Sequence, residues 1–163
     1  MLLTEALVTP HYNYCDVIYD GCSVKARSNL QRNQNYAARA LLGKKKRSSG
    51  TEALKRLKWL PLEKRRKLHT GVFAHKAVNG RSSRHAMCMV EDLKPQHNYG
   101  TRSVRNNNLN SQVHTTKQLE RAISFRLSKV WNSIPATLKS CQNANAMKNK
   151  WQGLLIDDFL TDC

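Results

Sequence analysis

The chain has 163 residues, which is enough for one domain with a core or for two small lobes, and too few for a complete polymerase. Lys and Arg number 28 against 11 Asp and Glu, so the formal net charge is +17. Because charge repulsion at this density opposes a compact state, it predicts a polyanionic partner, nucleic acid ahead of an anionic membrane surface.

The N-terminal residues predict short helices. A first helix over residues 2–8 is interrupted at Thr9-Pro10, because the residue before proline is disfavoured in helical conformation. A second helix over residues 11–19 carries Tyr12, Cys15 and Ile18/Tyr19 at helical spacing, which is typical of a core stripe.

Residues 23–47 predict a helix with two unlike faces, followed by a basic exit. Ser23 is available as its cap and Gly43 as its stop. Lys25, Arg32 and Arg39 recur every seven residues with Tyr36 beside them, so they form one cationic face. We expect the opposite face to pack against the core. It consists of Ala26, Leu30, Asn33, Gln34, Ala37 and Leu41.

Two further helices are expected before residue 81. Ser49 and Glu52 have the spacing of a capping box for a short helix with Ala53, Leu54 and Leu57. Pro61 then opens a helix over residues 62–78 with Leu68, Val72 and His75 on one stripe, and Asn79-Gly80 ends it.

The second half of the chain predicts a long loop and two C-terminal helices. Residues 81–116 lack helical periodicity, and we expect a loop-rich linker there. Thr115 and Gln118 have capping spacing for a helix that carries Ile123, Leu127, Val130 and Ile134 and closes at Pro135. A last helix over residues 143–160 is expected to bury Ala144, Met147, Trp151, Leu154 and Leu155.

No alternating run of β-branched residues occurs, so the predicted fold is mostly α. We divide it into a basic helical region over residues 1–80, the linker over residues 81–116, and a C-terminal helical region over residues 117–163.

Several stretches, taken in order, resemble the C-terminal part of the reverse transcriptase of non-LTR retrotransposons of the LINE type, jockey-like elements in particular. They are PHYNYC at 10–15, LQRNQN at 30–35 with AAR at 37–39, LKWLPL at 57–62 with RR at 65–66, KAVNG at 76–80, YGTR at 99–102 and VWNSIP at 130–135. Their order covers nearly the whole chain.

The resemblance implies a region at and beyond the helical thumb that follows the polymerase palm, a bundle that grips template and primer without doing chemistry. Its partners would be RNA or an RNA–DNA duplex and the upstream polymerase region. We therefore expect phosphate contacts from a set of basic residues with one aromatic neighbour, namely Lys25, Arg32, Tyr36, Arg39, Lys44, Lys45, Lys46, Arg47, Arg65, Arg66 and Arg102.

Catalytic, metal and cofactor sites are not expected. Reverse transcriptases hold two metal ions with carboxylates, partly in an aromatic-x-Asp-Asp hairpin, and Asp157-Asp158 after Leu155-Ile156 lacks the aromatic and a strand partner. Asp16 and Asp20 are read as exposed acids that cap or solvate. A zinc site is set aside because only His85 and Cys88 have paired-ligand spacing.

The five scattered cysteines and the absence of a signal-peptide pattern in MLLTEALVTP predict a reduced intracellular setting, nuclear or cytoplasmic. No apolar stretch approaches bilayer length, so we expect no membrane span. The leading hypothesis is a non-catalytic nucleic-acid-binding segment. The alternatives are a helical module whose basic face meets an acidic protein, and a decayed transposon fragment without activity.

Overall fold

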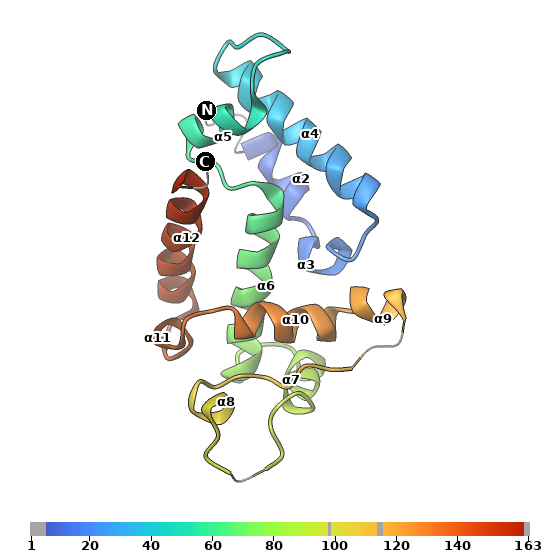
Figure 1. Cartoon of the computed structure of the whole chain (residues 1–163), viewed down its shortest axis with the longest axis vertical. Coiled ribbons are helices and arrows are strands. Elements are labelled where there is room, and N and C mark those ends of the chain that lie inside the picture. The colour runs from blue at the N-terminus through green and yellow to red at the C-terminus, as the bar shows by residue number, and fades with distance from the viewer. Residues whose placement is uncertain (1–5, 98, 114–115, 162–163) are drawn as a thin grey trace. The chain divides into compact units, whose positions relative to one another are not determined.

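The computed structural model describes residues 6–97, 99–113 and 116–161 (Figure 1). Within these ranges it contains eleven helices and no strand, which confirms the mostly α prediction. The helices are α2 Thr9–Asn13, α3 Asp16–Tyr19, α4 Val24–Leu41, α5 Gly50–Leu57, α6 Leu62–Val78, α7 Arg84–Glu91, α8 Arg102–Arg105, α9 Lys117–Arg121, α10 Ile123–Asn132, α11 Ala136–Lys139 and α12 Ala144–Thr161.

The chain divides into two compact units that differ from the three predicted segments. Unit 1 comprises residues 1–66 and 153–163, and unit 2 comprises residues 67–152. The predicted boundaries at 80 and 116 do not coincide with the division between these units. They were placed where periodicity changes along the sequence, whereas the units are joined by contacts between distant segments, and the division falls inside α6 and α12.

The start of unit 1 contains two short helices where one was predicted. Cys15 has a φ of 50°, in the left-handed region, and this breaks the helix between α2 and α3. Cys15 is exposed and Ile18 is 70% exposed, so the predicted core stripe is wrong at these positions. The buried residue of this segment is Asp16. The predicted helix over residues 2–8 lies mostly outside the described residues.

α4 begins and ends as predicted. The Ser23 hydroxyl oxygen accepts a hydrogen bond from the backbone N–H of Ala26, and Gly43 follows the helix with a φ of 61°. The buried side chains are Gln34 and Ala38, while Asn33 and Leu41, predicted to face the core, are exposed. Gln34 is tolerated there because its Nε2 donates to the Leu60 carbonyl at 2.9 Å.

α5 lies against the C-terminal part of α4 and contributes to a small core (Figure 1). Ala38 packs with Ala53 and Leu54 of α5 and with Phe159 of α12. The predicted cap is confirmed, since the Ser49 hydroxyl accepts from the Glu52 N–H at 3.3 Å. This packing holds α4 against α5, and the loop between the two helices is anchored at both of its ends.

In unit 2, the largest fully buried side chain is Trp131 of α10. Its ring centroid lies 6.3 Å from that of His75, which is buried on α6. Leu127, Ile134, Met147 and Trp151 are buried as predicted. Leu154, by contrast, is 49% exposed, so its predicted burial is wrong.

The predicted linker over residues 81–116 is more ordered than its sequence indicated. It contains α7, capped by Ser83, and α8, capped by Thr101. Ala86 and Val90 bury the inner side of α7. The prediction failed because α7 is only two turns long, too short to show a clear period.

The asparagine run in this segment is a loop held at both its backbone and its side chains. Trp131 Nε1 donates to the Asn107 carbonyl at 2.7 Å, and Asn132 exchanges two hydrogen bonds with the backbone of Leu109. Lys139 Nζ donates to the Asn106 carbonyl and, at 2.6 Å, to Asn108 Oδ1. The loop is therefore a fixed part of unit 2.

The helix predicted to end at Pro135 is divided into α9 and α10, which meet at Ala122. The predicted cap at Thr115 and Gln118 lies outside the described residues and side chains. Thr116 is the observed cap, and its hydroxyl accepts from the Leu119 N–H at 3.3 Å. α11, which was not predicted, follows Pro135.

Gly71 gives a first test of this packing. A Cβ at Gly71 would lie 2.0 Å from Cζ3 of the Trp151 ring, so the rigid ring must move. We expect Gly71→Ala to lower the free energy of unfolding by about 1–3 kcal/mol, measured by urea denaturation. The matched control is Gly153→Ala, where a Cβ meets nothing within 4 Å. That variant should gain up to about 1 kcal/mol from helix propensity, and an equal gain at Gly71 would contradict the packing.

Candidate nucleic-acid interface

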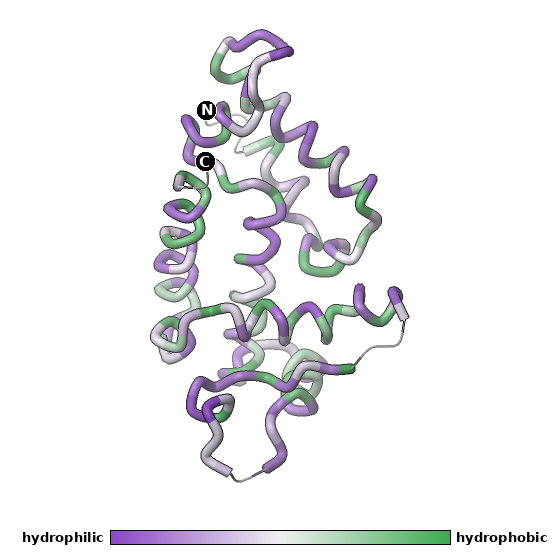
Figure 2. The backbone as a smooth tube through the Cα atoms, in the orientation of Figure 1, coloured by the Kyte–Doolittle hydropathy of each residue, from purple (hydrophilic) through white to green (hydrophobic). Residues whose placement is uncertain are grey.

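The cationic face of α4 is exposed along the helix. Lys25 and Arg32 are exposed, and Tyr36 is 61% exposed beside them. Seven residues of helix separate Lys25 from Arg32 by about 10.5 Å along the axis. Neither cation has an ion pair among the described residues. Figure 2 shows hydrophilic residues along much of α4 and the loop that follows it.

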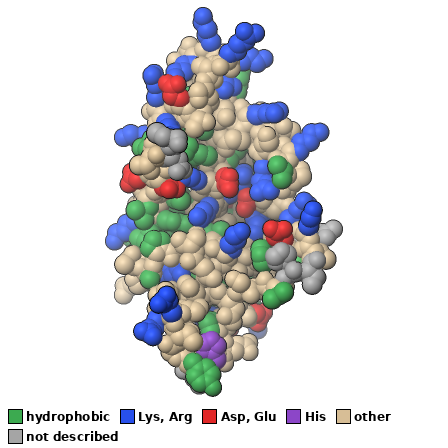
Figure 3. Space-filling view, in the orientation of Figure 1, with side chains coloured by type: hydrophobic (Ala, Val, Ile, Leu, Met, Phe, Trp, Pro, Cys, Tyr) green, Lys and Arg blue, Asp and Glu red, His purple; other side chains and the backbone are tan. Residues whose placement is uncertain are grey.

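The loop between α4 and α5 extends the positive charge. Lys45, Lys46 and Arg47 are exposed and have no acidic partner in the described part of the chain. Figure 3 shows Lys and Arg side chains over this loop and along α4. We call Lys25, Arg32, Lys45, Lys46 and Arg47 the cationic ridge. All five belong to the same compact unit, unit 1.

Arg39 lies in register with the ridge but is half-buried. Its Nη1 donates to the Ser48 carbonyl at 3.4 Å, and its Nε is buried without a hydrogen-bond partner. The side chain therefore runs under the loop after α4. We assign it to the support of that loop.

Lys44, predicted as a phosphate contact, is neutralised in the structure. Its Nζ lies 2.8 Å from Oε1 of Glu52, and Arg56 approaches the same oxygen at 3.4 Å. The side chain of Lys44 is only 19% exposed. The ion pair joins the loop to α5, so we remove Lys44 from the predicted contacts.

Arg66, which was also predicted as a phosphate contact, is buried and paired in the structure. Its side chain is 4% exposed, and its Nε donates to Oδ1 of Asp20 at 2.6 Å. A buried, paired guanidinium cannot reach a phosphate. The basic run at residues 64–67 hid this, because sequence spacing did not show that Arg66 is on the inner face of α6. Asp16 and Asp20, predicted to be exposed, are buried and half-buried respectively.

The remaining two predicted contacts are separate from the ridge. Arg65 is half-buried, and its Nη1 lies 3.5 Å from Oδ1 of Asn13. Arg102 is exposed at the start of α8 in unit 2. Arg65 belongs to α6 and Arg102 to α8, so neither is part of α4 or the loop that follows it.

The Glu52 carboxylate gives a pH-dependent test of the loop. The hydrogen bond from Lys44, with its charge, holds the pKa of Glu52 below the usual value for a glutamate. Stability from this pair is therefore present above the ordinary glutamate pKa and is lost as the pH falls through the lower folded-state pKa. We expect the stability difference between the protein and Glu52→Gln to vanish at acidic pH, measured by denaturation across a pH series. A difference that persists after protonation would contradict the ion pair.

Carboxylates do not gather on the described surface. Within residues 6–97, 99–113 and 116–161, no three His, Cys, Asp or Glu side chains are placed to hold a metal ion. Asp157 and Asp158 lie in the last turns of α12, and Asp158 pairs with Lys64. His85 and Cys88 are both exposed on α7.

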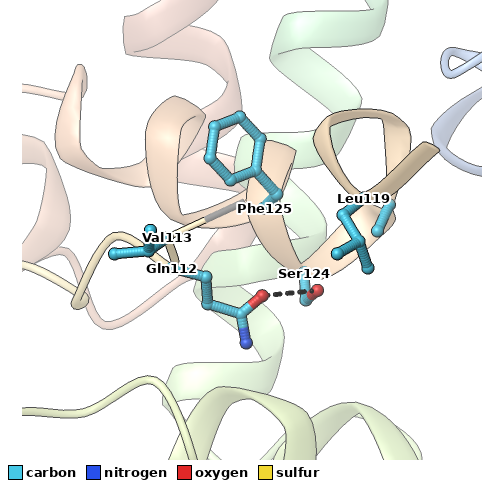
Figure 4. A pocket seen from close by; sticks show the side chains of 6 residues that line it. Gln112, Val113, Leu119, Ser124 and Phe125 are labelled. Carbon is cyan, nitrogen blue, oxygen red and sulfur yellow. Dashed lines mark hydrogen bonds between the residues drawn. The ribbon is translucent and has the colours of Figure 1, made fainter. Parts of the chain in front are cut away.

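Unit 2 contains a pocket of about 400 Å³, and none of the described residues that line it has a titratable side chain (Figure 4). Val113, Leu119 and Phe125 line it, and the Ser124 hydroxyl donates to Oε1 of Gln112 at 3.0 Å. No base is hydrogen-bonded to this serine among the residues drawn. The described lining of this pocket therefore offers no nucleophile–base pair of the kind that hydrolytic chemistry uses.

Lys139 has a perturbed pKa for a structural reason. Burial lowers the pKa of its ammonium group, which lies 5.4 Å from the centre of the Trp131 ring. Its hydrogen bonds go to the asparagine loop described above. The group stabilises that loop and faces no second reactive side chain among its described contacts.

Comparisons with family models, curated proteins and solved structures found no match to this chain. The described helices include none with both the length and the apolar character needed to cross a membrane.

Proposed function

We propose that the chain is a non-catalytic nucleic-acid-binding segment of a retrotransposon-derived RNA-directed DNA polymerase, which grips template and primer through the cationic ridge. The observation that carries the proposal is the exposure of five cations on α4 and its loop with no acidic partner in the described structure. The resemblance in sequence supplies the parent family, and the ridge supplies the mode of binding.

The chemistry of the ridge suits a phosphate backbone. Lys and Arg side chains attract phosphates, and their binding releases counterions that were condensed on the nucleic acid. This release is the main source of sequence-independent affinity. Tyr36 adds an aromatic ring that can stack on a base or donate a hydrogen bond to a phosphate. An acidic protein partner would also meet the cations, so competition with RNA separates the two partners.

The test compares two pairs of substitutions in the full chain. We expect Lys25→Ala/Arg32→Ala to weaken binding of an RNA–DNA duplex by about tenfold for each lost phosphate contact at 50 mM salt. The control is Lys117→Ala/Lys129→Ala, which removes the same charge from exposed positions in unit 2. Equal losses in both variants, measured by fluorescence anisotropy, would show that net charge and not the ridge is responsible.

A further inference from the structure

A small groove in unit 2 combines an aromatic wall with three basic side chains. It has a volume of about 200 Å³ and is lined by His69, Val72, Phe73 and Lys76 of α6 and by Lys148 of α12. We call it the aromatic groove. None of these residues belongs to the cationic ridge or to the basic set expected from the sequence.

Helical spacing explains how α6 presents this lining. The four residues stand at i, i+3, i+4 and i+7, so they share one face. Two apolar side chains, Val72 and Phe73, are flanked by His69 at one end and Lys76 at the other. Val72 and Phe73 are half-buried, which leaves part of the Phe73 ring available to a ligand.

The opposite wall is held firmly in place. Trp151 of α12 packs against the backbone of Gly71, with no room for even a Cβ between them. Lys148 stands three residues before Trp151 on the same helix and so on the same side. The close helix contact therefore sets the position of Lys148 beside the α6 residues.

The charges around the groove favour an anion. Lys76 and Lys148 have no ion pair among the described residues. Residues 67–152 contain 14 Lys and Arg and three Asp and Glu. In Figure 3, hydrophobic side chains gather over α6 and α12 with Lys and Arg side chains around them.

We propose that the aromatic groove binds one unpaired nucleobase, which stacks on Phe73 while its flanking phosphates contact Lys76 and Lys148. The proposal rests on the proposed function and adds single-stranded nucleic acid to its ligands. The volume is below the range of about 300–1,000 Å³ of drug-sized sites, so it suits one ring system. Every base has a π-face, and phosphates meet lysines readily, whereas a peptide would need both an apolar anchor and acids.

The test uses the full chain and a single-stranded ten-nucleotide RNA, compared with an abasic strand of the same phosphate count. We expect the strand with bases to bind roughly 5- to 150-fold more tightly. Phe73→Leu, which keeps the apolar volume and removes the ring, should abolish this difference. Phe73→Tyr should keep it. Lys148→Ala should weaken binding of both strands and leave the Phe73-dependent difference in place.

The outcome separates this proposal from the previous one. Suppose that binding of a blunt RNA–DNA duplex depends on Lys25 and Arg32, but that Phe73→Leu leaves the preference for the strand with bases unchanged. This result would overturn the proposal for the aromatic groove and leave the proposed function standing. Absence of duplex binding would overturn the proposed function. An acidic, leucine-containing peptide that binds in a Phe73-dependent manner and is not displaced by the RNA would assign the groove to a protein partner instead.

Discussion

Asp20→Ala is expected to lower the free energy of unfolding by about 3–5 kcal/mol, because it leaves the Arg66 guanidinium buried without its carboxylate. Arg66 is 4% exposed, and its Nη1 already lacks a hydrogen-bond partner. Loss of the 2.6 Å contact from Nε removes the compensation for burying this charge. Urea denaturation monitored by circular dichroism measures the change.

The control for this prediction removes the charge as well. The double variant Asp20→Ala/Arg66→Met replaces the pair with an apolar side chain of similar length, which often costs little in stability. We expect it to recover most of the stability lost in Asp20→Ala. A single variant as stable as the original protein would show that Arg66 reaches water, and would return it to the set of possible phosphate contacts.

The second large effect is expected when the whole cationic ridge is removed. At 50 mM salt a phosphate contact contributes roughly tenfold in affinity, so replacing Lys25, Arg32, Lys45, Lys46 and Arg47 by Ala should weaken duplex binding by about 10⁴- to 10⁵-fold. None of the five side chains is buried or paired in the described structure, so the fold should be retained. Fluorescence anisotropy gives the affinity and circular dichroism the helical content.

A matched five-charge variant tests the specificity of this effect. Lys117, Arg121, Lys129, Lys150 and Arg105 are exposed cations of unit 2. Their replacement by Ala removes the same net charge and is expected to reduce duplex affinity far less than loss of the ridge. Equal reductions would mean that the duplex responds to the total charge of +17 and not to α4 and its loop.

The helices that were predicted well from the sequence are those with a helical pattern sustained over several turns or with a clear capping residue. α4, α5 and α6 have Ser23, Ser49 and Pro61 at their starts, and the structure places these helices within a residue or two of the expected bounds. The break at Cys15 could not be predicted, because its left-handed φ arises at a residue other than glycine. α7 was not predicted, because its eight residues are too few to show a clear helical period.

The cationic ridge was predicted more reliably than the inner contacts. Helical register alone identifies Lys25 and Arg32 as neighbours on one face. The roles of Lys44 and Arg66 depend on Glu52 and Asp20, which lie 8 and 46 residues away in sequence. Helical register carries no information about such partners. From the sequence, a basic residue that pairs with a distant acid therefore cannot be distinguished from one that is exposed. The aromatic groove was not predicted either, because its lining combines residues of α6 with Lys148 of α12, and helical register on α6 alone does not show that neighbour.

The central claim is that the five cations of the ridge contact phosphates, and the salt dependence of RNA–DNA duplex binding measures this most directly. Five contacts predict a slope of about −4 to −5 for log K against log salt, which is roughly a 500-fold loss of affinity between 50 and 200 mM. The variant without the ridge should show a much shallower slope. A flat response in the original protein, or the same steep slope in the variant, would contradict the account.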